Sequence, residues 1–212
     1  MEVGVAEAAR LLGVSERRAR ALAESQRLRA REVSGRWLID AASIPRRARP
    51  AVRPMSEANA WALALGPSEW DVDAKVAYRL RQARNRLVHS DDPGALLGAW
   101  LAVRAQRLLL AAPEPQELLQ DPRVVASGVS DERSFLSAAH QAEGYVRASD
   151  LEELLLDYLL VESSQPNVIL HVGPELPPRP LPVLLLAADL VEHDGPRELA
   201  RARELLRTEL AT

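Results

Sequence analysis

The stretch GVSERRARALAESQRLRAREVSGRWLI, residues 13–39, decides how the N-terminal part of this chain folds. It opens on a glycine, which can adopt the positive φ of a sharp turn, and Ser15 follows as a helix-capping residue. Just before it, residues 3–13 place Val5, Ala8, Ala9 and Leu12 on one helical face. We therefore predict two short helices joined by a tight turn, with Val14 holding that turn in the core.

The second helix has an apolar inner face and a basic outer face. Ala19, Leu22 and Ala23 face inward, whereas three arginines lie outward near the helix N-terminus. This is the part of a DNA-reading helix that meets base edges and phosphates. The candidate DNA contacts here are Ser15, Glu16, Arg17, Arg18 and Arg20.

The segment that follows predicts a β-hairpin. Apolar positions alternate through LRAREV, residues 28–33, and RWLID, residues 36–40, around a two-residue turn. Alternation on both sides of such a turn is a hairpin signal. The candidate DNA contacts on or beside the hairpin are Arg29, Arg31, Ser34 and Arg36.

A small α/β surface element with solvated arginines would explain these charges, but not the order of helix, glycine turn, capped basic helix and basic hairpin. Residues 3–44 resemble the winged helix-turn-helix of excisionase and MerR-like proteins, through VAEAARLLGVSERRARAL and SGRWLID. The resemblance implies binding to double-stranded DNA, with Arg36 at the wing tip and Trp37 at its base. Gln26 departs from the pattern, because relatives usually have glycine there, which loosens the helix end.

Composition limits the chemistry. Of 212 residues, 47% are hydrophobic, 27% are charged and none is cysteine. The lack of cysteine excludes a disulfide framework, a thiol nucleophile and Cys-ligated zinc. Neither the apolar core of a signal peptide nor a membrane-length apolar run is found, so we expect a cytoplasmic protein without membrane contact.

Charge is distributed unevenly. Residues 1–54 hold 12 arginines against 6 acidic residues, a net of +6. Residues 55–112 carry +1 and residues 113–212 carry −10. This distribution favours an anionic partner for the N-terminal part alone, although an acidic C-terminal half also serves solubility.

The chain is expected to be α+β, in four parts. A winged helix-turn-helix at 1–45 precedes a linker at 46–54, a helical connector at 55–112 and a mixed α/β domain at 113–212. Ser149 and Glu152 form the pattern of a capping box. Helices are predicted at 56–66, 70–89, 94–103, 113–122, 149–160, 181–195 and 196–210, and strands at 143–148 and 167–173.

The rest of the chain resembles actinobacterial helix-turn-helix proteins related to AbiEi-type antitoxins. The matching stretches are RPMSEANAWALAL, QDPRVVASGVS, EGYVRASDLEELLLDYLL, QPNVILHVGP and VLLLAADLVEHDGPRELARARELL. The resemblance implies a repressor of its own operon that counteracts a nucleotidyltransferase toxin, with or without direct contact. One winged helix contacts few phosphates, so we expect an inverted-repeat operator bound by a homodimer.

Two residues near the last helix junction match that family's pattern. Asp189 and Arg197 are candidates for a toxin-neutralising surface. An ion pair that joins the last two helices is the alternative, and we favour it.

A second class of function rests on RNRLVH, residues 84–89, which fits the Arg-Asn-x-x-x-His motif of HEPN ribonucleases. Arg84 would hold the scissile phosphate and His89 would act as general acid or base, best across a dimer. Asp91, Asp92 and Pro93 break the helix directly afterwards, so we rank the ribonuclease below the regulator. An excisionase-like recombination factor is a further alternative.

Other catalytic signals are missing from the sequence. The four histidines share no metal-ligand spacing, and no glycine-rich phosphate loop occurs. We therefore expect a protein that is not an enzyme and needs neither metal nor cofactor.

Overall fold

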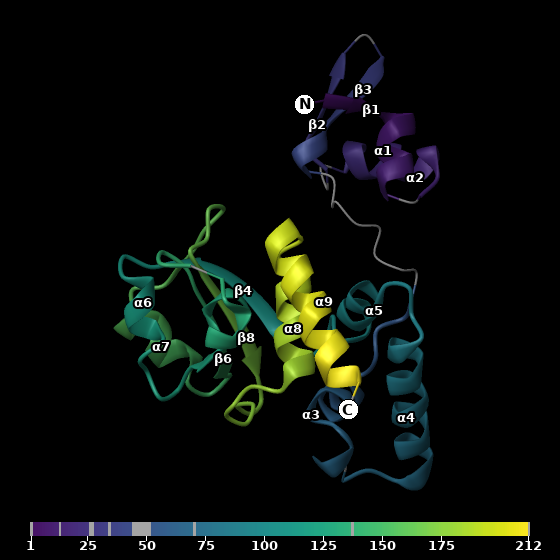
Figure 1. Ribbon diagram of the computed structural model, residues 1–212. Helices are drawn as coiled ribbons and strands as arrows, with labels where there is room; N and C mark the ends of the chain where they lie inside the picture. Colours follow the sequence, from purple (N-terminus) through teal and green to yellow (C-terminus); the bar gives the residue numbers. More distant parts are fainter. Residues whose placement is uncertain are drawn as a thin grey trace. The chain divides into compact units, whose positions relative to one another are not determined.

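The computed structural model describes residues 2–12, 14–25, 28–33, 35–43, 52–69, 71–136 and 138–211. The chain forms two compact units, Met1–Pro50 and Ala51–Thr212, each with its own hydrophobic core (Figure 1). Most of the predicted linker, residues 46–51, lies outside the described residues. The α+β class is confirmed, because both units combine helices with a sheet.

The N-terminal unit packs two helices on a three-stranded antiparallel sheet of order β1-β3-β2. The two helices and the hairpin were predicted, whereas β1 was not. Its three residues contain a single buried apolar side chain, Val3, which is too short a pattern to read as a strand. The elements are β1 Glu2–Gly4, α1 Val5–Leu12, α2 Glu16–Glu24, β2 Ala30–Val33, β3 Arg36–Asp40 and the 3-10 turn η1 Ala41–Ser43.

Small side chains let the two helices approach each other closely. Ala8, Ala9, Ala19 and Ala23 are buried between them and the sheet. The expectation that Val14 holds the turn in the core is wrong, because its side chain is 37% exposed. The turn is held by the backbone, where the Val14 amide donates to the Ala9 carbonyl at 3.0 Å.

The C-terminal unit contains a five-stranded mixed sheet of order β5-β6-β8-β4-β7. Strands β6 and β8 run parallel, and the other neighbours are antiparallel. The strands are β4 Gln106–Ala111, β5 Val125–Ala126, β6 Ala142–Arg147, β7 Val161–Glu162 and β8 Val168–Gly173. The helices are α3 Glu57–Leu65, α4 Ala74–Val88, α5 Pro93–Trp100, α6 Pro115–Leu118, α7 Leu151–Asp157, α8 Val183–Glu192 and α9 Pro196–Leu210. The 3-10 turns are η2 Pro67–Glu69, η3 Gly128–Ser130 and η4 Glu132–Ser134.

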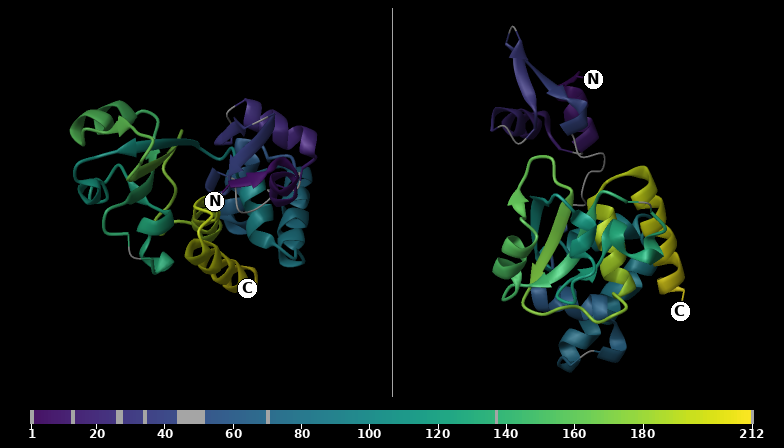
Figure 2. Two further views of the ribbon diagram at one scale, coloured as in Figure 1. Left: turned by 90° about the horizontal axis from the view of Figure 1, so that it is seen from above. Right: turned by 90° about the vertical axis from the view of Figure 1, so that its left-hand side faces the viewer.

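Helices cover both faces of this sheet. Helices α8 and α9 lie on one side, and α6 and α7 lie on the other (Figures 1 and 2). Successive residues of a strand point to opposite faces, so Val146 of β6 packs with the α7 side while Tyr145 points toward α8. The α8-facing side of β6 and β8 also carries Glu143 and His171, two buried polar residues.

The expected boundary between a helical connector and a C-terminal domain at residue 112 is not found. Helices α3, α4 and α5 share one core with α8 and α9, so residues 55–112 are not a separate helical connector. Strand β4 also falls within that range and pairs with both β7 and β8. An apolar helix face must be buried against another element, and α8 and α9 provide that element.

Two local predictions of helix starts have different outcomes. The helix predicted at 56–66 forms as α3, and Ser56 caps it, because its Oγ accepts from the Asn59 amide at 3.4 Å. The capping box at Ser149 is not formed: α7 begins after Asp150, and the Ser149 hydroxyl donates to the Asp150 carboxylate at 3.0 Å. In the described part of the chain, no helix is long and apolar enough to cross a membrane.

Candidate nucleic-acid interface

Helix α2 presents its basic residues on a fixed outer face. The Ser15 hydroxyl caps the helix by accepting from the Arg18 amide at 3.3 Å, as predicted. Ala19 and Ala23 are buried on the inner face, which sets the rotation of the helix. Side chains from the first turn onward are exposed, namely Ser15, Glu16, Arg17, Arg18 and Arg20.

These arginines carry charge that the protein does not neutralise. Among the described residues, Arg17, Arg18 and Arg20 have no side-chain hydrogen bond or ion pair. They lie at the N-terminal end of a helix, where the backbone dipole also favours an anion. This end of α2 is therefore suited to bind phosphates and guanine edges.

The hairpin forms the wing that the sequence predicts. Val33 pairs with Arg36 across the turn of the hairpin, and Gly35 has a φ of 75°. Glycine adopts this conformation without strain. Arg36 is exposed beside the turn, and Trp37 is half-buried against the core. The candidate contact Ser34 lies outside the described residues.

Arg29 precedes the wing and is exposed, while its backbone is tied down. Its amide donates to the Ser43 hydroxyl at 3.0 Å, and its carbonyl accepts from the Asp40 amide at 2.8 Å. These bonds join the start of the hairpin to η1. The backbone of Arg29 is thus held in place, while its side chain is exposed.

Arg31 differs from the other candidate contacts because it has an acidic partner. Its Nε and Nη2 atoms donate to the two Glu2 carboxylate oxygens at 2.8 and 2.7 Å. The hydrogen bond raises the pKa of Arg31 and lowers the pKa of Glu2. Strands β2 and β1 flank β3, so this pair spans the sheet and offsets the charge of Arg31 within the protein.

Asp189 does not lie on a surface. It is fully buried on α8 and is bonded to Arg104, to the Ser127 hydroxyl and to the Tyr145 hydroxyl, the last at 3.0 Å. Arg197 is exposed on α9 and is not its partner. Both the helix-joining pair and the neutralising surface that we expected at Asp189 are therefore wrong, because Asp189 is buried and its cation is Arg104, which lies between α5 and β4.

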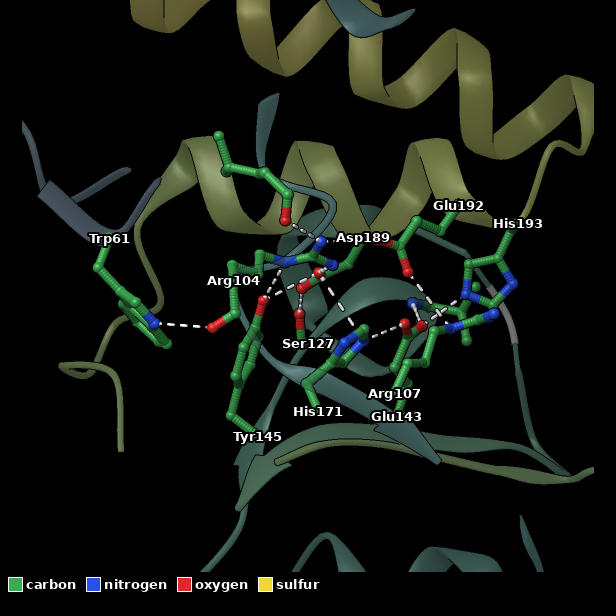
Figure 3. Close-up of polar contacts among 12 residues, drawn as sticks. Trp61, Arg104, Arg107, Ser127, Glu143, Tyr145, His171, Asp189, Glu192 and His193 are labelled. Carbon is green, nitrogen blue, oxygen red and sulfur yellow. Dashed lines mark hydrogen bonds and ion pairs between the residues drawn. The ribbon is translucent and has the colours of Figure 1, made fainter. Parts of the chain in front are cut away.

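Asp189 belongs to a buried polar network between the sheet and α8 (Figure 3). Arg104 donates to the Tyr145 hydroxyl at 2.8 Å, to the Leu101 carbonyl at 3.0 Å and to Glu192 at 2.6 Å. Burial acts to lower the pKa of Arg104, but the charges of Asp189 and Glu192 raise it well above its usual value. Its guanidinium thus stays charged and joins β6 to α8.

Glu143 is the second centre of this network. It accepts from His171 at 2.9 Å, from His193 at 2.6 Å and from the Val129 amide at 3.1 Å (Figure 3). Burial acts to raise the pKa of Glu143, but the hydrogen bonds from the two histidines hold it well below its usual range. The pKa of His193 is raised, because the bond and charge of Glu143 outweigh burial.

Every buried side-chain nitrogen and oxygen of the described residues has a hydrogen-bond partner. The network therefore fastens α8 to the sheet. Sequence reasoning missed it, although one signal was available. Arg104, His171 and Asp189 each lie within an apolar run, where a charged or imidazole side chain needs a buried partner.

The ribonuclease motif does not form a site within the chain. Arg84 donates to Glu209 on α9, at 2.9 Å to the carboxylate and 3.3 Å to the carbonyl. His89 is exposed at the end of α4, where its Nδ1 lies 2.8 Å from the Asn85 carbonyl. The two side chains have separate partners. Across the described ranges, no three His, Cys, Asp or Glu side chains are placed to hold a metal ion.

Comparison with known proteins agrees with the N-terminal geometry. Residues 3–47 match a protein family described as a helix-turn-helix domain. Met1–Pro50 is thus a helix-turn-helix unit. This places the protein in the broad class of DNA-binding regulators. Searches of curated proteins and of solved structures found no match to the chain.

Proposed function

We propose that this protein is a sequence-specific transcriptional repressor of its own operon and the antitoxin of a toxin–antitoxin pair. The observation that carries the DNA-binding part is the set of exposed arginines on α2 and the wing that have no acidic partner among the described residues. Arg17, Arg18, Arg20 and Arg36 belong to the unit that matches a helix-turn-helix family. Such arginines are matched in charge and geometry to a DNA groove.

Helix α2 and the wing contact different parts of the DNA. Arg17 and Arg20 near the start of α2 contact base edges in the major groove, and Arg36 beside the wing turn contacts a phosphate. Arg31, already bonded to Glu2, contributes less. Because one unit contacts few phosphates, two copies bind an inverted repeat as a homodimer.

The antitoxin role is supported by the AbiEi-type resemblance of segments across Ala51–Thr212. The toxin would be a nucleotidyltransferase encoded beside this gene, and a stable complex with it is not required. Asp189 is buried and takes no part in a neutralising surface, whereas Arg197 is exposed and stays a candidate.

A reporter fused to the DNA upstream of the gene tests repression. Wild-type protein should lower reporter expression, and the Arg17→Ala, Arg36→Ala double variant should not. Arg197→Ala, Arg203→Ala is the matched control, because it removes two exposed arginines from the other unit. Equal repression by wild type and the double variant would contradict the proposal.

Co-expression with the product of the neighbouring gene tests the antitoxin role. Full-length protein should restore growth to cells that express the toxin. Residues 52–212 should also do so, because this unit has its own core. Growth arrest that full-length protein does not relieve would contradict the antitoxin role. The proposed role as a transcriptional regulator would not be affected by that result. An integrase gene in that place, with excision dependent on the protein, would favour the recombination factor.

A further inference from the structure

The outer face of α4 carries a continuous basic stripe. Lys75, Arg79, Gln82, Arg86 and His89 recur every three or four positions, which places them along one side of the helix. All five are exposed. We call this set the α4 stripe. Residues 74–88 hold five basic residues and no acidic one, although residues 113–212 carry −10.

The stripe stays at the surface because a different face of α4 is packed against the core. Leu80, Ala83 and Leu87 are buried against the core that α4 shares with α3, α5 and α9. Figure 1 shows α4 at the margin of the helical part of this unit. Arg84 points instead to α9, where Glu209 binds it, and so does not belong to the stripe.

No acidic side chain among the described residues forms an ion pair with the cations of the stripe. Within the described ranges, Lys75 and Arg79 have no ion pair. Arg86 lies over the Trp100 ring at 5.8 Å, a contact that orients a guanidinium and keeps its charge. Tyr78 stands beside the stripe with 58% of its surface exposed. Cations collected on one helix without acids repel each other, and an anion relieves that repulsion.

We propose that the α4 stripe is a second DNA-binding surface, which contacts the phosphate backbone of the duplex that flanks the operator. This inference rests on the proposed function, because the helix-turn-helix unit brings the DNA. From Lys75 to His89 the helix rises about 21 Å, which matches roughly six base pairs of duplex. Along this length Lys75, Arg79 and Arg86 supply three positive charges that match the negative charge of the phosphates of DNA.

Connectivity favours DNA over another polyanion. Residues 44–51 join the two units, and eight residues span at most roughly 30 Å. DNA bound by Met1–Pro50 is therefore held at high effective concentration near Ala51–Thr212. An acidic surface of a second copy is the competing occupant, and the experiment separates the two.

The test is fluorescence anisotropy of full-length protein on two duplexes from the DNA upstream of its gene. One duplex is limited to the sequence that a variant without the stripe's charges protects in footprinting, and the other adds flanks on both sides. The variant is Lys75→Gln, Arg79→Gln, Arg86→Gln. The control is Arg197→Gln, Arg203→Gln, Arg207→Gln, which removes the same charge from exposed positions of α9.

Wild type and control should bind the flanked duplex more tightly than the short one, and the α4 variant should lose this difference. Its salt dependence on the flanked duplex should become shallower by about 2.7 in log–log slope per bound copy, the value for three lost phosphate contacts. Affinity for the short duplex should stay unchanged.

Equal slopes for the α4 variant and wild type would overturn the proposal, as would an equal loss in the α9 control. An unchanged slope together with a lower mass in sedimentation would assign the stripe to a second copy instead. If wild type binds neither duplex, the proposed function itself fails, and this proposal fails with it. An unaltered urea midpoint of each variant excludes unfolding as the cause.

Discussion

Arg104, which follows α5, and Asp189 on α8 form an ion pair in which both side chains are almost completely buried, at 2% and 0% exposure. Eighty-five positions separate them in sequence. The pair joins the helical segment before β4 to the helix that covers the sheet. It explains why residues 55–112 and 113–212 fold as one unit.

Breaking this pair should destabilise the C-terminal unit strongly. Arg104→Met removes the cation and leaves Asp189 buried without it, which costs about 3–5 kcal/mol of unfolding free energy. Urea denaturation measures the change. In Arg104→Met, Asp189→Leu no carboxylate is left unpaired at position 189, so the double variant should be more stable than Arg104→Met. A single variant within about 1 kcal/mol of wild type would contradict the structural role of the pair.

The contact between His193 and Glu143 should make stability depend on pH. The pKa of His193 is raised by Glu143, so the protonated ring stabilises the folded state. This contribution is complete below the ordinary His pKa of about 6.5 and is lost as pH rises through the raised value. Arg107 and Glu198 also act on His193, in opposite directions.

Urea titrations between about pH 6 and pH 9 check this expectation. Wild type should lose more unfolding free energy over that interval than His193→Gln, whose side chain can bond to Glu143 but does not titrate. Equal losses in the two proteins would show that His193 does not titrate against Glu143.

The two residues of the ribonuclease motif should affect stability differently. Arg84→Ala removes the half-buried contact with Glu209 and should lower the unfolding free energy by about 1 kcal/mol. His89→Ala changes an exposed helix-end residue and should have an effect within roughly 0.5 kcal/mol. Overexpression of wild type should not cleave cellular RNA. Cleavage that disappears in His89→Ala would instead establish the ribonuclease.

Arg31 and Arg36 should differ in their importance for DNA. Arg36 has no acidic partner among the described residues, so Arg36→Ala should weaken binding to all sequences and reduce the log–log salt slope by about 0.9 per bound copy. Arg31→Ala should have a smaller effect, because Glu2 already offsets that charge. Anisotropy across a salt series measures both slopes. A larger effect of Arg31→Ala would show that the Glu2 pair opens on DNA.

Local patterns predicted the elements that have local causes. Ser15 has a side chain that can cap a helix, Gly35 allows the tight turn, and the spacing of Ala8, Ala19 and Ala23 marks the inner faces. The two helices and the hairpin of the N-terminal unit depend on contacts between residues close in sequence. These elements were therefore accessible from the chain alone, whereas β1, which pairs with the distant strand β3, was not.

Contacts between distant segments were not predictable in the same way. Strand β4 consists of QRLLLA, residues 106–111. This short and mostly apolar run fits a helix or a strand equally well. Asp189 has partners in three distant segments of the chain, so the residues near it in sequence do not indicate that Arg104 is one of them. The same limit applies to Arg31, whose partner Glu2 lies on a strand that the pattern did not show.

Fluorescence anisotropy on the duplex upstream of the gene tests most directly whether Met1–Pro50 binds specific DNA through α2 and the wing. Arg17→Ala alone should cost about 1–3 kcal/mol of binding free energy, the value of a lost base contact. The Arg17→Ala, Arg20→Ala, Arg36→Ala variant should lose discrimination between this duplex and a scrambled one, while Arg10→Ala, which removes an exposed pair with Glu7, should retain it. Equal affinity and discrimination in wild type and the triple variant would contradict the DNA-binding role of these arginines.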